Sequence, residues 1–131
     1  MQLGREKISI ETGKVAKQAD GSAWVKYGGT VVLVTAVAAR KEENLYFLPL
    51  TVDYRERGYA GGKIPVVYGR REPRPGIPEQ LTSRLIDHCI RPLFPKGYNQ
   101  EVQVMCSVLS YDKENLANVP ALIGTSAALC M

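Results

Sequence analysis

The sequence is poor in the residues that build metal sites, disulfide frameworks and membrane spans. It holds one histidine, His88, and three widely spaced cysteines without a Cys-x-x-Cys pair: Cys89, Cys106 and Cys130. Neither zinc ligation nor a disulfide scaffold is expected, and the cysteines are predicted to be reduced core thiols. No run approaches the roughly 18–20 apolar residues of a membrane span, and the first residues lack the grading of a secretory signal. We therefore expect a cytoplasmic protein without a membrane partner.

Common catalytic motifs are also missing. Residues 58–63 contain the glycines and the lysine of a phosphate-binding loop, but no serine or threonine follows them. No serine lies in a nucleophile elbow. His88 falls in the middle of an expected helix beside Asp87, where a surface position is the simpler interpretation. These common motifs therefore identify no catalytic residue in this chain.

What the sequence does have is a local excess of positive charge. The formal net charge is +4 and the pI is about 9.0, values that suit a polyanionic partner without establishing one. Between positions 55 and 74 lie the basic residues Arg55, Arg57, Lys63, Arg70, Arg71 and Arg74, against the acidic residues Glu56 and Glu72. The sequence therefore predicts a basic loop at residues 55–78, which is also rich in glycine and proline.

The first part of the chain shows the alternation and the β-branched residues of strands. Strands are expected at residues 7–11, 15–19, 22–27, 30–39 and 46–54. Asp20-Gly21 and Gly28-Gly29 are typical of turns. Residues 30–39 are almost wholly apolar, which predicts a central strand buried on both faces. Pro49 inside the strand at 46–54 indicates an edge or a bulge.

The second part contains two expected helices with a strand between them. A helix is expected at residues 79–94, a strand at about 101–111 with valines and a cysteine on one face, and a helix at 119–131. The apolar side of the first helix should carry Leu81, Leu85, Ile86, Cys89, Ile90 and Leu93. These elements predict an α+β fold in which helices cover a mixed β-sheet.

The last helix runs to the end of the sequence without a glycine cap or a basic last turn. We interpret this as a truncated chain, and a natural carboxy-terminal helix is the alternative.

The arginine and tyrosine side chains of the basic loop suit contacts with phosphates and bases. Arginine presents a planar fork of donors that matches phosphate oxygens, and tyrosine offers a ring on which a base can stack. Such side chains on a glycine-rich backbone suit an irregular single strand of nucleic acid. In the alternative interpretation the loop is merely solvated, and its arginines pair with Glu56, Glu72 and Glu79.

Several blocks of the sequence are familiar in order and spacing. They are ETGKVAKQADGS (11–22), PLTVDYRER (49–57), YAGGKIP (59–65), SRLID (83–87), RPLFP (91–95) and IGTSAAL (123–129). Over nearly its whole length the chain resembles the first RNase PH-like domain of the polynucleotide phosphorylase family. The resemblance implies an RNase PH-like fold of the ribosomal protein S5 domain 2-like type, with residues 1–131 forming an incomplete domain.

The resemblance also implies an activity for the parent protein. Members degrade RNA from its 3′ end with inorganic phosphate as co-substrate, release nucleoside diphosphates, and run the reaction in reverse. Three subunits form a homotrimeric ring, and proteins of an RNA-degradation complex are expected partners. In the family, Mg²⁺ and the main catalytic carboxylates belong to the second RNase PH-like domain, so no metal ligand is expected here.

The family's RNA-gripping motif consists of two bulky residues, two basic residues and then Glu-Gly-Arg-Pro. Its counterpart here is YGRREPRP at residues 68–75, which assigns RNA or phosphate contacts to Tyr68, Arg70, Arg71 and Arg74. Gly69 and Pro73 depart from the motif and put base stacking in doubt. Arg91 is also a candidate contact, or it forms a salt bridge that supports the end of the helix. The family usually has arginine and proline at the positions of His88 and Cys89.

Two functions are compatible with these observations. The chain is either one piece of a ring-forming phosphorolytic exoribonuclease, with RNA contacts and scaffold but no catalytic centre, or an inactive RNA-binding module or fragment.

Overall fold

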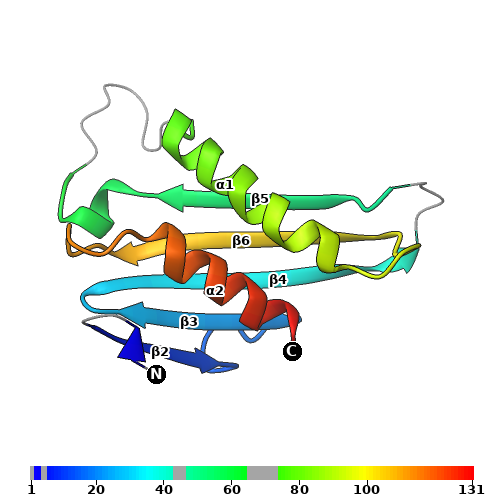
Figure 1. Ribbon diagram of the computed structural model, residues 1–131, viewed down its shortest axis with the longest axis horizontal. Helices are drawn as coiled ribbons and strands as arrows, with labels where there is room; N and C mark the ends of the chain where they lie inside the picture. Colours follow the sequence, from blue (N-terminus) through cyan, green and yellow to red (C-terminus); the bar gives the residue numbers. More distant parts are fainter. Residues whose placement is uncertain (1, 4–5, 43–46, 65–73) are drawn as a thin grey trace.

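The protein is an α+β unit in which two helices cover one face of a mixed sheet (Figure 1). The computed structural model describes residues 2–3, 6–42, 47–64 and 74–131. The strands are β1 Gln2–Leu3, β2 Glu6–Thr12, β3 Gly21–Tyr27, β4 Thr30–Glu42, β5 Leu50–Glu56 and β6 Gln100–Ser110; the α-helices are α1 Ile77–Ile90 and α2 Asn118–Leu129. Short 3₁₀ turns, η1 Gly58–Gly61 and η2 Arg91–Leu93, follow β5 and α1. Among the described helices, none is both long enough and apolar enough to cross a membrane.

The sheet has the strand order β1-β2-β3-β4-β6-β5. Strands β1 to β4 pair antiparallel in sequence order, and β4 pairs antiparallel with β6. Among the described strands only β5 and β6 run parallel, and α1 lies in the connection between them. In Figure 1 α1 lies over β5 and β6, while α2 lies over β3 and β4.

The connection between β2 and β3 corrects two predictions. Residues 15–19 form bends and turns, so the expected strand there is wrong. Gly13 and Ala16 both have positive φ, of 65° and 55°, which breaks the extended backbone. Asp20-Gly21 is not a hairpin turn either, because Gly21 already pairs with Ala36 in the ladder between β3 and β4.

Strand β4 is central, as expected, but it is covered on one face only. Val32, Val34 and Ala36 are buried. Residues 31, 33 and 35 on the opposite face are half-buried, and Val37 is exposed. The prediction of burial on both faces is therefore wrong, because α1 and α2 pack on the same side of the sheet.

Strand β5 forms one edge of the sheet, which agrees with the position of a proline near it. It begins at Leu50, so Pro49 lies just before the strand and not inside it. The Pro49 carbonyl still accepts a hydrogen bond from the Val102 amide at 2.9 Å, which starts the parallel pairing with β6. Along β6 the alternation is regular, with Val102, Val104, Cys106 and Val108 in the core.

Helix α1 packs on the sheet through a narrower stripe than its apolar pattern predicts. Ile86 and Ile90 are buried, but Leu81, Leu85, Cys89 and Leu93 are exposed. The predicted apolar side spans about half of the helix circumference, whereas a helix over an edge strand contacts it along one row. The row of α1 that faces the sheet consists of residues 79, 83, 86 and 90. This row contains both polar and apolar side chains.

Helix α2 approaches the sheet closely because glycines lie at the contact. A Cβ atom on Gly124 would come within 2.8 Å of Cγ2 of both Val25 and Val34. A Cβ atom on Gly21 would lie 2.0 Å from the Ala128 carbonyl oxygen. The helix axis can therefore stay this near to β3 and β4 only while both positions lack a side chain.

The three cysteines do not share one environment. Cys106 is buried in the core beside the Thr125 hydroxyl, and burial raises the pKa of its thiol to about 11. Cys89 and Cys130 are exposed, so the prediction of three core thiols is wrong for these two. Cys130 follows the last residue of α2, and Cys89 lies on the outer side of α1.

Asp112 joins the end of β6 to the turn between β3 and β4. Its carboxylate accepts hydrogen bonds from the Gly29 amide at 2.9 Å, the Thr30 hydroxyl at 3.0 Å and the Asn115 amide at 2.8 Å. These donors stabilise the charged form, and the Asn115 amide contributes most to lowering the pKa of Asp112. The same carboxylate therefore fixes both the Gly28-Gly29 turn and the entry to α2.

We predict that Gly124→Val lowers the free energy of unfolding by about 2–3 kcal/mol, because the new side chain meets Val25 and Val34 in a packed contact. Gly61→Val is the matched control, since no atom lies within 4 Å of its Cβ position. Urea unfolding of the two variants measures the difference. Equal stability of the two would show that α2 does not depend on this close approach.

Candidate functional site

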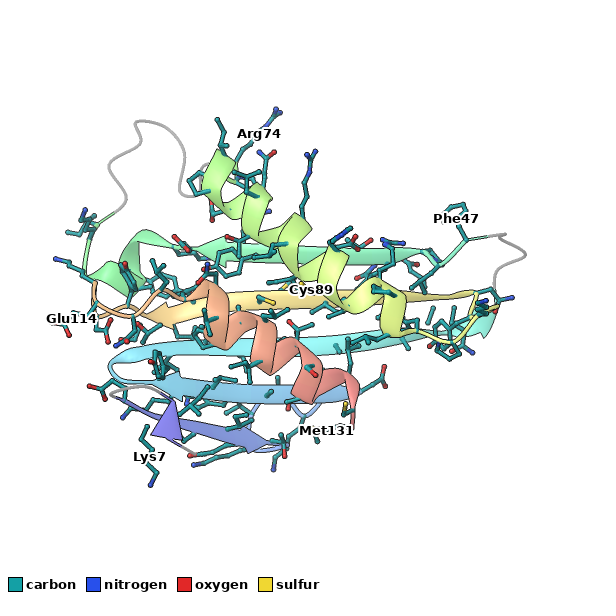
Figure 2. The ribbon with its side chains drawn as sticks, viewed as in Figure 1. Lys7, Phe47, Arg74, Cys89, Glu114 and Met131 are labelled. Carbon is teal, nitrogen blue, oxygen red and sulfur yellow. The ribbon has the colours of Figure 1, made fainter. Side chains whose placement is uncertain are left out.

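The basic loop predicted at residues 55–78, called the basic stretch from here on, connects β5 to α1. The structure describes both of its ends. Arg55 and Arg57 lie at the end of β5, Lys63 follows η1, and Arg74 precedes α1. Tyr68, Arg70 and Arg71 lie outside the described residues, so their roles stay predictions. Figure 2 shows Arg74 beside the amino end of α1, where its side chain is exposed.

The segment after β5 has a defined backbone. Gly62 has a φ of 69°, and its amide donates to the Tyr59 carbonyl at 3.0 Å. The Lys63 amide donates to the Gly58 carbonyl at 2.9 Å, and the Tyr111 amide donates to the Ala60 carbonyl at 2.9 Å. These bonds hold η1 against the end of β6. Tyr59 is 53% exposed and therefore presents its ring to solvent.

A cavity of about 370 Å³ opens beside this segment. It lies at the carboxyl ends of the parallel strands β5 and β6, where open sheets often bind ligands. Three of its lining residues are cationic, Arg57, Lys63 and Lys113, and one, Glu56, is acidic. Sequence reasoning missed Lys113 because it comes from the segment after β6 and no local pattern connects it with the basic stretch.

Two acidic side chains of β5 accept hydrogen bonds from neighbouring side chains of the same strand. The buried Tyr54 hydroxyl donates to the Glu56 carboxylate, and burial together with this bond raises the pKa of Tyr54. Arg55 Nε donates to Asp53 at 2.9 Å. The alternative in which the loop arginines pair with Glu56, Glu72 and Glu79 stays a prediction, because Glu72 lies outside the described residues.

Glu79 bridges the two ends of the basic stretch. Its Oε1 accepts a hydrogen bond from the Glu56 amide at 2.8 Å, and its Oε2 accepts one from the Gly76 amide at 2.6 Å. The second bond is half of a capping box at the start of α1. The first bond crosses to the end of β5, 23 positions earlier in the sequence.

Arg91 is held at the other end of α1. Its guanidinium contacts Asp87, with Nη2 at 2.7 Å from Oδ1 and Nε at 3.1 Å from Oδ2. It also donates to the carbonyls of Leu48 and Leu50, at 3.0 and 3.3 Å. The hydrogen bond to Asp87 is the largest cause of the raised pKa of Arg91. This geometry favours the structural alternative for Arg91, whereas its contact with RNA stays a prediction.

These contacts belong to one pattern along the outer edge of β5. The Ser83 hydroxyl donates to the Val52 carbonyl, between the sites of Glu79 and Arg91. Three side chains of the α1–η2 segment, those of Glu79, Ser83 and Arg91, thus bind backbone groups of β5 and of the residues before it. None of the described strands pairs with these groups. An edge strand with free groups is open to pairing with other chains, and these side chains close it.

The described residues do not offer a metal site. No group of three or more His, Cys, Asp or Glu side chains in the described part of the chain could hold an ion. The donor set present here therefore does not fit Mg²⁺. His88 is exposed on α1, and Ser83 is bound to the backbone.

Comparison with known proteins identifies the domain type. The family model for RNase PH, described as the 3′ exoribonuclease family, domain 1, matches residues 5–131. The chain belongs to this family. The match agrees with the α+β fold of a mixed sheet and two helices, and it confirms the RNase PH-like fold class.

Two curated relatives of this RNase PH domain carry the same name. The chain is 55% identical over 128 residues to the polyribonucleotide nucleotidyltransferase of Anaeromyxobacter dehalogenans (strain 2CP-C), and 55% identical over 130 residues to that of Rhodospirillum centenum. These alignments cover 97% and 98% of the chain but 18% of each relative. The resemblance to the polynucleotide phosphorylase family is confirmed, and the chain spans about a fifth of the length of these relatives.

A solved structure shows the same fold at low identity. It is described as the Archaeoglobus fulgidus exosome with RNA bound to the active site. The TM-score is 0.67 at 21% identity, with 94% of this chain and 50% of that chain covered. At this identity the comparison supports the fold alone.

We predict that Arg91→Lys lowers the free energy of unfolding by about 1–2 kcal/mol, because an ammonium group cannot reproduce the forked contacts with Asp87 and the β5 edge. Arg84→Lys, at an exposed position of α1, is the control. Thermal unfolding and RNA affinity are measured on both. A loss of RNA affinity without a loss of stability would assign Arg91 to RNA binding instead.

Proposed function

We propose that this RNase PH domain is part of a phosphate-dependent 3′–5′ exoribonuclease, a polyribonucleotide nucleotidyltransferase. The observation that carries the proposal is the family match over residues 5–131, and the shared name of relatives at 55% identity supports it. The proposal includes the reverse reaction, a homotrimeric ring, a cytoplasmic location and contacts with proteins of an RNA-degradation complex. Single-stranded RNA is the substrate, and the exosome neighbour was solved with RNA bound.

The reaction makes a specific demand on the protein. An oxygen of inorganic phosphate attacks the last phosphodiester phosphorus, the bond to the 3′ oxygen of the preceding nucleotide breaks, and a nucleoside diphosphate leaves. Both reactants are anions, so fixed cations must offset their repulsion in the bound state and in the transition state. Mg²⁺ would supply charge stabilisation in a part of the parent protein other than the described residues.

We assign the RNA contacts of this domain to its basic stretch. Arg70, Arg71 and Arg74, with Tyr68, are the proposed residues, and Arg91 is a further candidate. The exposed positions of Arg74, Lys63 and Tyr59 at the same end of the molecule support the assignment. Guanidinium groups can bind two phosphate oxygens at once and keep their charge near neutral pH. Departures from the family motif at Gly69 and Pro73 make phosphate contact a better-supported role than base stacking.

A second candidate is an RNA-binding or scaffold module without activity. The described part of the chain has no group of three or more His, Cys, Asp or Glu side chains that could hold a metal ion, which is compatible with both candidates. In both cases this domain contributes RNA contacts and structure, and the two differ in whether another part of the parent protein carries out the chemistry.

We predict that Arg70→Ala with Arg71→Ala in the full-length protein weakens RNA binding and degradation but leaves assembly intact. The slope of log K against log salt should become shallower by about 0.7 for each lost phosphate contact. Lys7→Ala with Lys17→Ala removes the same charge from exposed positions in β2 and in the turn after it. An unchanged affinity and slope in the arginine variant would contradict the assignment.

We predict that the 131-residue chain alone releases no ADP from poly(A) with phosphate and Mg²⁺, whereas the full-length protein does. Chromatography of the products measures the diphosphate. Omission of phosphate from the full-length reaction is the control that separates phosphorolysis from hydrolysis. Robust release by the short chain would contradict the proposal that the catalytic centre lies elsewhere. No release by the full-length protein would favour the inactive module.

A further inference from the structure

One carboxylate holds both ends of the basic stretch. The Glu56 amide lies between Arg55 and Arg57, and the Gly76 amide lies two residues after Arg74. Both amides donate to Glu79, one to each oxygen, at 2.8 and 2.6 Å. The two backbone segments are therefore fixed at the separation that a single carboxylate can span.

Neighbouring contacts show that both attachment points are themselves anchored. The Glu56 side chain accepts the hydroxyl of the buried Tyr54, which holds the end of β5 in the core. Gln80 Nε2 donates to the Pro75 carbonyl at 3.1 Å, which holds the residue beside Arg74 against α1. Glu79 therefore connects two anchored backbone segments, the end of β5 and the residues just before α1.

This arrangement fixes the two described ends of the stretch before any ligand binds. Side chains on a backbone that is already held lose less conformational entropy when they bind. Charge-assisted hydrogen bonds from two amides are strong enough to hold such a closure. The carboxylate itself repels a polyanion, so any benefit that it brings to RNA binding must come from geometry.

We propose that Glu79 is a positioning residue for RNA binding, which holds the segment of Arg74 beside the end of β5 so that the Arg74 guanidinium group can meet a phosphate of the RNA strand. The proposal rests on the proposed function of the basic stretch. Glu79 does not touch the RNA, and it acts through Arg74, which its bond to Gly76 holds near the end of β5.

The sign of the effect distinguishes positioning from charge. Glu79→Gln removes a negative charge beside a cationic stretch, which by electrostatics alone tightens RNA binding. In this variant the new side-chain amide nitrogen would face one of the two backbone N–H donors, so one of the two hydrogen bonds is lost. If Glu79 positions the stretch, the full-length variant binds single-stranded RNA about tenfold more weakly, as expected for one lost hydrogen bond to a charged group.

Two further variants test the length of the side chain at position 79 and the effect of removing a carboxylate elsewhere on the molecule. Glu79→Asp keeps the charge but is one methylene shorter, so it too should weaken binding if both amides must be reached. Glu11→Gln removes a carboxylate from β2, at the other side of the sheet, where it pairs with Lys14 at 2.7 Å. This control should leave the RNA affinity unchanged.

A double-mutant cycle with Arg74→Ala tests whether Glu79 acts through this arginine. Fluorescence anisotropy with a single-stranded RNA gives the dissociation constants, and hydrogen exchange at the Glu56 and Gly76 amides reports whether the bridge has opened. We expect faster exchange in both Glu79 variants, weaker binding, and little further loss when Glu79→Gln is added to Arg74→Ala.

Unchanged or tighter RNA binding by Glu79→Gln, with faster amide exchange, would overturn the proposal and leave Glu79 as a helix cap. Equal losses from Glu79→Gln in the presence and absence of Arg74 would also overturn it. The function proposed above fails separately, if Arg70→Ala with Arg71→Ala leaves RNA affinity and degradation unchanged. A variant that loses its assembly in size-exclusion chromatography is replaced by Glu79→Asp, for which the same outcomes apply.

Discussion

The lateral hydrogen bonds between the α1–η2 segment and the edge of β5 decide how the second half of the molecule is placed. Glu79, Ser83 and Arg91 bind backbone groups that the outermost strand leaves unpaired. Ile86 and Ile90 enter the core from the same side of the segment. The polar contacts with β5 and the apolar contacts with the core come from one row of side chains. The rotation of α1 about its own axis is therefore fixed. Its amino end must then lie beside the end of β5, where the basic stretch begins and ends.

The sequence was informative about elements whose signal is local. The alternation at residues 102–108 predicts the buried face of β6, and β-branched residues predict β4 as a central strand. Predictions from the sequence were wrong where contacts between distant parts of the chain determine the local structure. The apolar pattern of α1 suggested that Leu81 and Leu85 face the core, but the edge of β5 needs hydrogen-bonding side chains, and these occupy part of the contact row. Residues 15–19 lack a strand because of two residues with positive φ.

The same distinction applies to the candidate site. The basic residues and the family motifs are readable in the sequence, since they lie close together in it. The bridging role of Glu79 is not, because its partner at Glu56 lies 23 positions away. The capping-box spacing signals only the bond to Gly76. Likewise, the partners of Arg91 at Leu48 and Leu50 are 43 and 41 positions away, so its structural role became clear only from the fold.

The position of β6 has a consequence for how the chain is made. This strand lies between β4 and β5 although it is synthesised after both. While a ribosome adds the residues from β5 to the end of β6, a delay of about 3–11 s at ~5–20 residues per second, β5 has no partner strand. One side of β4 is unpaired for the same time. The nascent chain therefore exposes two strand edges and the apolar face between them until β6 has been synthesised, and that interval is when chaperones have access to them.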